Sequence, residues 1–121
     1  MNNHLSKREE EGLIRGLDRA EVLAATVAQL RKDLAVGADD LQEPPVGTEA
    51  FERLRTEVLA LLERWERAEP LALSRAVNRV DLTERTVDRA MDLGGLHQLA
   101  GFMVLRCLQK VLLRKHFASR V

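Results

Sequence analysis

The apolar segment over residues 95–117 constrains the fold of this chain more than any other feature. Between Leu96 and Leu113, the only side chains that interrupt its apolar and small residues are His97, Gln98, Arg106, Gln109 and Lys110. A helix that is apolar over so much of its circumference is normally surrounded by other helices. The segment is too short and too often interrupted to span a bilayer, which needs roughly 20 apolar residues. We therefore predict a buried C-terminal helix and no membrane span.

Two long amphipathic helices are predicted before it, over residues 6–36 and 48–69, because apolar residues recur there at steps of three and four. Ser6 and Glu9 have the spacing of a capping box, in which each side chain satisfies a backbone amide of the other. The intervening loop holds two prolines and an acidic cluster. We expect the two helices to pack as antiparallel partners.

Two short helices are predicted between the long pair and the C-terminal helix. Pro70 favours a helix over residues 71–80, since proline is well tolerated in a first turn. Asp81 and Glu84 form a second candidate capping box, which predicts a helix over residues 82–92. The predicted fold is therefore an all-α bundle of about five helices, in a single domain over residues 1–121.

Charge and cysteine content limit the partners and the cellular compartment that we expect for the protein. Lys and Arg balance Asp and Glu at 19 each, so no net field attracts nucleic acid or an anionic membrane. The single cysteine, Cys107, precludes an intramolecular disulfide and favours a reducing compartment. The N-terminal residues contain no apolar stretch of the kind that directs secretion. A cytoplasmic location is therefore predicted.

His97 is the first candidate site residue, because the string His97-Gln98-Leu99-Ala100-Gly101-Phe102 resembles the H-x-L-K-G-S motif of histidine-containing phosphotransfer domains. Those domains are helical bundles of about this size. The resemblance implies that His97 accepts a phosphoryl group and that Gly101 allows a response-regulator domain to approach. Ala100 and Phe102 stand in place of the lysine and serine of the motif. The alternative is that His97 simply lies in the first turn of a helix.

Other catalytic or ligand-binding patterns are not found. The histidines and Cys107 lack the close spacings that place two metal ligands on one helix face, and there is no H-E-x-x-H. No G-x-S-x-G turn or glycine-rich phosphate loop occurs. We therefore predict a non-enzymatic protein with no metal and no cofactor.

A basic C-terminal end supplies the second candidate site, formed by Arg106, Lys110, Arg114 and Lys115. Such a cluster can bind an acidic protein, anionic lipid or nucleic acid, although zero net charge and an aromatic content of 3% disfavour nucleic acid. The alternative that we favour is neutralisation within the protein or a second copy, by the acidic loop residues Asp39, Asp40, Glu43 and Glu49.

The apolar faces of the long helices exceed what a chain of this size readily covers, which predicts a homodimer formed by helix faces. The function expected from the sequence is a self-associating interaction or scaffolding module. Phosphotransfer through His97 and nucleic-acid association through the basic C-terminal end are the alternatives.

Overall fold

The computed structural model describes residues 5–118, which form six α-helices and one short 3-10 helix. In chain order the elements are α1 (Lys7–Arg15), η1 (Gly16–Asp18), α2 (Ala20–Leu34), α3 (Ala50–Ala68), α4 (Pro70–Val80), α5 (Glu84–Leu93) and α6 (Leu96–Ala118). No strand occurs in this part of the chain, so the all-α fold class predicted from the sequence is confirmed. None of these helices is long and apolar enough to cross a membrane.

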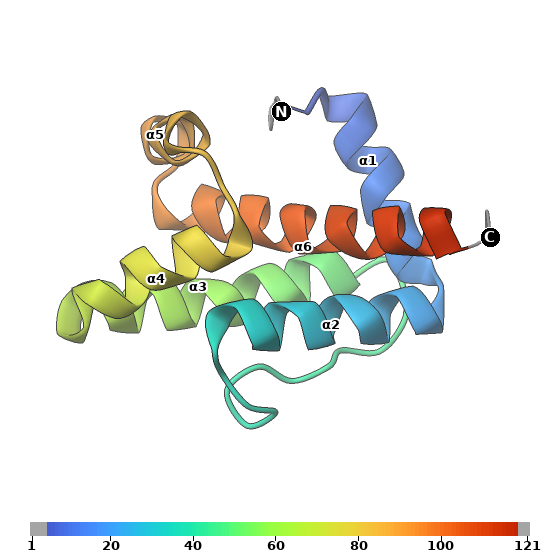
Figure 1. The fold of residues 1–121 in the computed structure, drawn as a ribbon, viewed down its shortest axis with the longest axis horizontal. Helices are drawn as coiled ribbons and strands as arrows, with labels where there is room; N and C mark the ends of the chain where they lie inside the picture. Colours follow the sequence, from blue (N-terminus) through green and yellow to red (C-terminus); the bar gives the residue numbers. More distant parts are fainter. Residues whose placement is uncertain (1–4, 119–121) are drawn as a thin grey trace.

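Helix α6 forms the centre of the bundle. It contacts all five of the other α-helices, with α2 and α3 on one side and α1 and α5 on the other (Figure 1). Leu99, Met103 and Leu108 on α6 are at most 2% exposed. Burying each such side chain stabilises the fold by roughly 1.5–3 kcal/mol relative to leaving it exposed. The predicted burial of the C-terminal helix is therefore confirmed for its central turns, whereas residues 113–118 are exposed.

Two helices replace the single helix predicted for residues 6–36. Helix α1 ends at Arg15, the 3-10 turn η1 follows, and Arg19 adopts an extended conformation before α2 begins. At this bend Gly16 lies against Leu108 and Leu112 of α6. The change of direction carries the chain past α6, so that α1 and α2 lie on opposite sides of it (Figure 1). The apolar spacing continues through the bend, which is why periodicity alone did not predict the break.

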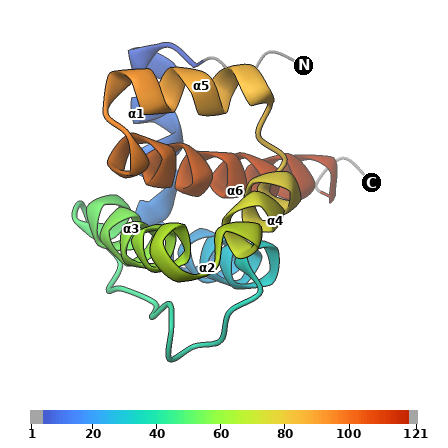
Figure 2. The same ribbon diagram turned by 90° about the vertical axis from the view of Figure 1, so that its left-hand side faces the viewer.

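Helices α2 and α3 are not the antiparallel partners that the sequence suggested. Both run in the same general direction, because the loop between them returns along the length of the molecule (Figures 1 and 2). Side chains hold this loop in place: Arg31 donates from Nε to the carbonyl oxygen of Leu41 at 2.9 Å. The backbone N–H of Gln42 donates to Glu57 Oε2 at 3.0 Å. Each long helix packs mainly against α6 rather than against the other.

The observed start of the first helix agrees with the sequence-based prediction, whereas the starts of α3 and α5 differ from it. The Ser6–Glu9 capping box is present, with both of its hydrogen bonds at 3.1 Å. Helix α5 begins at Glu84 rather than at residue 82, because Asp81 ends α4 in the left-handed conformation and Thr83 caps α5. Asp is one of the few residues whose short side chain tolerates that conformation. Helix α3 begins at Ala50 rather than at residue 48, and the side chain of its N-cap residue, Glu49, makes no capping hydrogen bond.

The apolar faces of α2 and α3 are covered by the chain itself. Val22 and Leu30 on α2, and Leu54 and Val58 on α3, are fully buried. Because these side chains already pack within the chain, they are not available to a second copy, and a homodimer would need another surface. The large apolar side chains that remain exposed in the described chain are Val46, Leu71, Met91, Leu93, Leu113 and Phe117.

Candidate functional site

Three of the four basic residues predicted as an interaction site bind side chains from other parts of the same chain. Arg106 donates from Nη2 to Asp81 Oδ2 at 2.9 Å, and Lys110 donates from Nζ to Asp33 Oδ2, also at 2.9 Å. Arg114 donates from Nη1 to Gln29 Oε1 at 2.6 Å. Only Lys115, in the exposed last turn of α6, lies outside these contacts. The polar stripe of α6 therefore links this helix to the C-terminal ends of α2 and α4.

The position of the Asp33 carboxylate in the fold explains why it needs Lys110 as a counterion. Its side chain is 9% exposed and sits in the last turn of α2, where the helix dipole disfavours negative charge. Gln29 donates from Nε2 to the second carboxylate oxygen at 3.0 Å, and Lys110 also donates to the carbonyl oxygen of Arg79 at 3.1 Å. Lys110 thus satisfies a buried carboxylate and a terminal carbonyl of α4 together.

Cys107 lies beside this pair, with Sγ 3.5 Å from Asp33 Oδ2. Burial raises the pKa of the Cys107 thiol, and the neighbouring Asp33 carboxylate raises it further. A thiol held protonated in this way is a poor nucleophile. Cys107 therefore acts as a packed core residue.

Within the described residues of one chain, the acidic loop does not contact the basic C-terminal end, and its neutralisation by a second copy stays a prediction. Asp40 Oδ1 lies 3.8 Å from Nη2 of Arg64 on α3. Glu49 Oε2 lies 3.5 Å from Arg53 Nη2. Asp39 and Glu43 are exposed. The carboxylates that meet the α6 cations are instead Asp33 and Asp81, which belong to the helix ends that α6 crosses.

His97 is exposed in the first turn of α6, where the alternative interpretation of the sequence placed it. The phosphotransfer resemblance required an accessible glycine four residues later. Gly101 is instead buried, and a Cβ on it would lie 3.2 Å from Arg55 Cδ and 3.8 Å from the Phe51 ring. The surface beside His97 therefore lacks the approach position that the resemblance implied.

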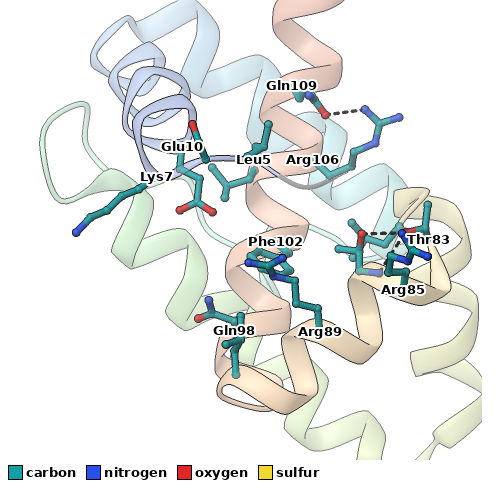
Figure 3. A pocket seen from close by; sticks show the side chains of 15 residues that line it. Leu5, Lys7, Glu10, Thr83, Arg85, Arg89, Gln98, Phe102, Arg106 and Gln109 are labelled. Atoms are coloured by element: carbon teal, nitrogen blue, oxygen red, sulfur yellow. Dashed lines mark hydrogen bonds between the residues drawn. The ribbon is translucent and has the colours of Figure 1, made fainter. Parts of the chain in front are cut away.

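A groove of about 800 Å³ lies between α1, α5 and α6, and sequence reasoning did not predict it (Figure 3). We call it the groove. Its apolar lining consists of Leu5, Leu82, Leu93, Phe102 and Leu105. Its charged lining consists of Lys7, Glu10, Arg85, Arg89 and Arg106, and its uncharged polar lining of Ser6, Thr83, Thr86, Gln98 and Gln109.

The walls of the groove follow from the caps and turns of the chain. The tight turn at Gly94 and Gly95, where Gly95 has a φ of +72°, returns the chain so that α5 lies alongside α6. Thr83 holds the other end of α5, since its hydroxyl accepts from the backbone N–H of Thr86 at 3.1 Å. The capping box at Ser6 begins α1, which forms the third wall.

Charge in the groove is distributed unevenly. Arg106 is committed to Asp81, and this hydrogen bond, together with the charges of Arg106 and Lys110, lowers the pKa of Asp81. Arg85 and Arg89 on α5 make no hydrogen bond or ion pair with any described residue. Figure 3 shows Arg89 directed into the groove and Lys7 directed away from it. The unpaired positive charge therefore lies on the α5 wall.

The sequence contained only weak signals for this groove. Gln98, Phe102, Leu105 and Gln109 lie at helical spacing on one stripe of α6, and Arg85 and Arg89 lie four residues apart on α5. Such stripes are common on surface helices, and only tertiary packing shows that they face one another.

Within residues 5–118, no three His, Cys, Asp or Glu side chains gather as metal ligands. Comparisons of the chain with protein families, with curated proteins and with solved structures found no match.

Proposed function

We propose that this protein is a non-enzymatic interaction module that binds an apolar segment of a partner protein in the groove. The observation that carries the proposal is the groove itself, about 800 Å³ of space with a leucine and phenylalanine lining and cations on one wall. Sites that hold a ligand are typically concave and mostly apolar, with a few polar groups that set orientation.

The exposure of the lining supports this proposal. Among the leucines that line the groove, Leu93 is 59% exposed, whereas Leu82 and Leu105 are 9% and 5% exposed. An occupant would therefore cover an accessible apolar side chain and contact a floor that is already packed. Helix α1 contains no fully buried residue, so this wall can adjust around an occupant at a small free-energy cost.

Binding of a neutral helical peptide to the purified protein tests the proposal. The probe is an amphipathic peptide with a leucine stripe and glutamine elsewhere, and fluorescence anisotropy reports its affinity. We expect Leu93→Asp to weaken binding about tenfold or more, because it places a charge where apolar contact is made. The matched control is Leu71→Asp, since Leu71 is 69% exposed on α4 and lies outside the groove. Equal binding by both variants, or no binding at all, contradicts the proposal.

Self-association is the second form of this proposal, with a second copy as the occupant. Sedimentation velocity across micromolar dilution separates the two forms. A dimer that Leu93→Asp dissociates indicates a second copy in the groove. A monomer throughout excludes a second copy as the occupant and leaves the first form of the proposal, which the peptide experiment tests. The cytoplasmic location inferred from the sequence stays a prediction.

The two alternative functions stay proposals with weaker support. Exposure of His97 is compatible with phosphotransfer, and an acid-labile phosphate that is lost in His97→Ala tests it. Nucleic-acid association requires cations that are free to meet phosphates, and Arg106, Lys110 and Arg114 are engaged within the fold. Its test is binding that falls steeply as salt is raised.

A further inference from the structure

We infer that the groove takes an amphipathic α-helix whose acidic residues face α5. This inference rests on the proposed function and adds the chemistry of the partner. It comes from three features of the groove: its length along α6, the cations on its α5 wall and the carboxylate on its α1 wall.

The length of the groove fits a helix. The α6 residues that line it extend from Gln98 through Phe102 and Leu105 to Gln109, which is about 16 Å at 1.5 Å per residue. That distance corresponds to about three helical turns. Helix α5 lies alongside α6. The last residue of α5, Leu93, and Leu82, which precedes α5 in the chain, both line the groove. An apolar stripe at i, i+4 and i+7 on an incoming helix would meet this lining along its whole length.

The α5 wall calls for negative charge on the partner. Arg85 and Arg89 are four residues apart, about 6 Å along the helix axis, and neither has an ion-pair partner among the described residues. The acidic residues of α5 are Glu84, Asp88 and Asp92, and none of them lines the groove. Two acidic residues at i and i+4 on a bound helix would therefore pair with the two arginines.

The α1 wall has the opposite character. Figure 3 shows the Glu10 carboxylate directed into the groove and Lys7 directed away from it. The Glu10 side chain makes no hydrogen bond or ion pair with residues 5–118. An acidic residue of the partner would be repelled from this wall, whereas a lysine or a small polar residue is compatible with it. The two walls together fix which side of the bound helix is acidic.

The expected contributions differ in size. Apolar contact with Leu93 and Phe102 supplies most of the affinity, whereas an ion pair at a solvent-exposed edge changes affinity by only about two- to fivefold. Charge in this groove therefore selects the partner and its orientation more than it tightens binding. Two arginines acting together predict a preference of about tenfold for an acidic flank.

Three designed peptides of about 14 residues test the inference. They share one leucine stripe and carry glutamate, glutamine or lysine at i and i+4 on one flank. We expect the wild-type protein to bind the glutamate peptide about tenfold more tightly than the glutamine peptide, and the lysine peptide most weakly. The preference should shrink as salt is raised, because exposed charges are screened.

Charge reversal in the protein provides the decisive comparison. In the double variant Arg85→Glu and Arg89→Glu, the order of the three peptides should reverse. The matched control is Arg75→Glu with Arg79→Glu, since these arginines have the same spacing on α4, are exposed and lie outside the groove. The control should keep the wild-type order.

The possible results separate this inference from the proposed function. Equal affinity for all three peptides, still abolished by Leu93→Asp, overturns the inference and leaves the proposed function standing. A preference for the lysine peptide overturns it too, because Glu10 would then dominate the groove. Absence of binding by every peptide overturns the proposed function itself.

Discussion

Two sets of basic side chains in this protein lie in opposite surroundings. On α6, Lys110 and Arg106 form ion pairs with carboxylates at the ends of α2 and α4. On α5, Arg85 and Arg89 border the groove and pair with no described residue. The α6 set is prominent in the sequence because no acidic residue lies near it, yet it serves to join helices. A basic segment can therefore mark where a fold needs counterions rather than where a partner binds.

The largest difference in stability between the two sets of basic side chains is expected when Asp33 is replaced. We predict that Asp33→Ala lowers the free energy of unfolding by about 2–4 kcal/mol, because Lys110 then loses its carboxylate at a site that is only 20% exposed. Urea denaturation measures the change. The control is Asp40→Ala, since Asp40 and Arg64 form a more exposed pair, and we expect a loss below about 0.5 kcal/mol. Equal losses in both variants would show that the α6 pair is not structural.

The next largest difference in the free energy of unfolding is expected between one arginine of each set, Arg106 on α6 and Arg89 on α5. The Arg106 side chain is 11% exposed, so Arg106→Ala removes buried packing as well as the contact with Asp81, and should lower the free energy of unfolding by about 1–2 kcal/mol. Arg89→Ala should change it by less than about 0.5 kcal/mol, because Arg89 is exposed and unpaired. Thermal unfolding of both variants checks this. If Arg89→Ala is the more destabilising change, Arg106 is not the structural residue of the two.

A third prediction concerns the wall of the groove formed by α1. Ser6→Ala removes the N-cap and should destabilise α1 by about 1 kcal/mol. Because α1 contains no fully buried residue, we expect the loss as faster amide exchange confined to residues 7–15, together with weaker peptide binding. Ser74→Ala, at an exposed position within α4, is the control and should leave both measurements unchanged. Faster exchange across the whole chain in Ser6→Ala, rather than in residues 7–15 alone, would contradict local opening.

The smallest expected effect is the pH dependence due to Asp81. The hydrogen bond from Arg106 lowers its pKa in the folded protein below its value of about 3.9 in the unfolded chain. A carboxyl group shifted in this direction stabilises the fold above pH 4 or so and loses that contribution as the pH falls through the folded pKa. Because the Asp81 side chain is 72% exposed, the contribution is at most a few tenths of a kcal/mol.

NMR titration of the Asp81 carboxyl carbon measures this shift. In Arg106→Gln the midpoint should move up toward the unfolded value. A midpoint that does not move would mean that Arg106 does not hold this carboxylate in solution.

The helical fold and several helix ends could be predicted from short-range patterns. Apolar spacing predicted burial of α6, and the Ser6–Glu9 spacing predicted a capping box that the structure contains. The bend at Gly16 was missed because apolar residues keep their spacing through it. The direction of α3 was missed because a loop of this length can either cross one end of a bundle or return along its side.

The candidate site was less predictable than the fold. Arg106, Lys110 and Arg114 were predicted to form an interaction site because they cluster in the sequence. In the structure each binds a side chain from another part of the chain, namely Asp81, Asp33 and Gln29 respectively. Two of those partners lie more than 70 residues away in the chain. No local pattern can indicate which distant side chain a cation will meet.

Three properties could be read from the sequence alone: the chain is helical, the central turns of α6 are buried, and Ser6 caps the first helix. These properties arise from interactions within a few residues, which a linear pattern records directly. Tertiary packing, in contrast, sets three other properties. Arg106, Lys110 and Arg114 of α6 bind side chains of other helices or helix ends, the apolar faces of α2 and α3 are covered, and α1, α5 and α6 enclose a groove. Those outcomes depend on how helices far apart in the chain cross one another, and that geometry is set by the packing of the whole core.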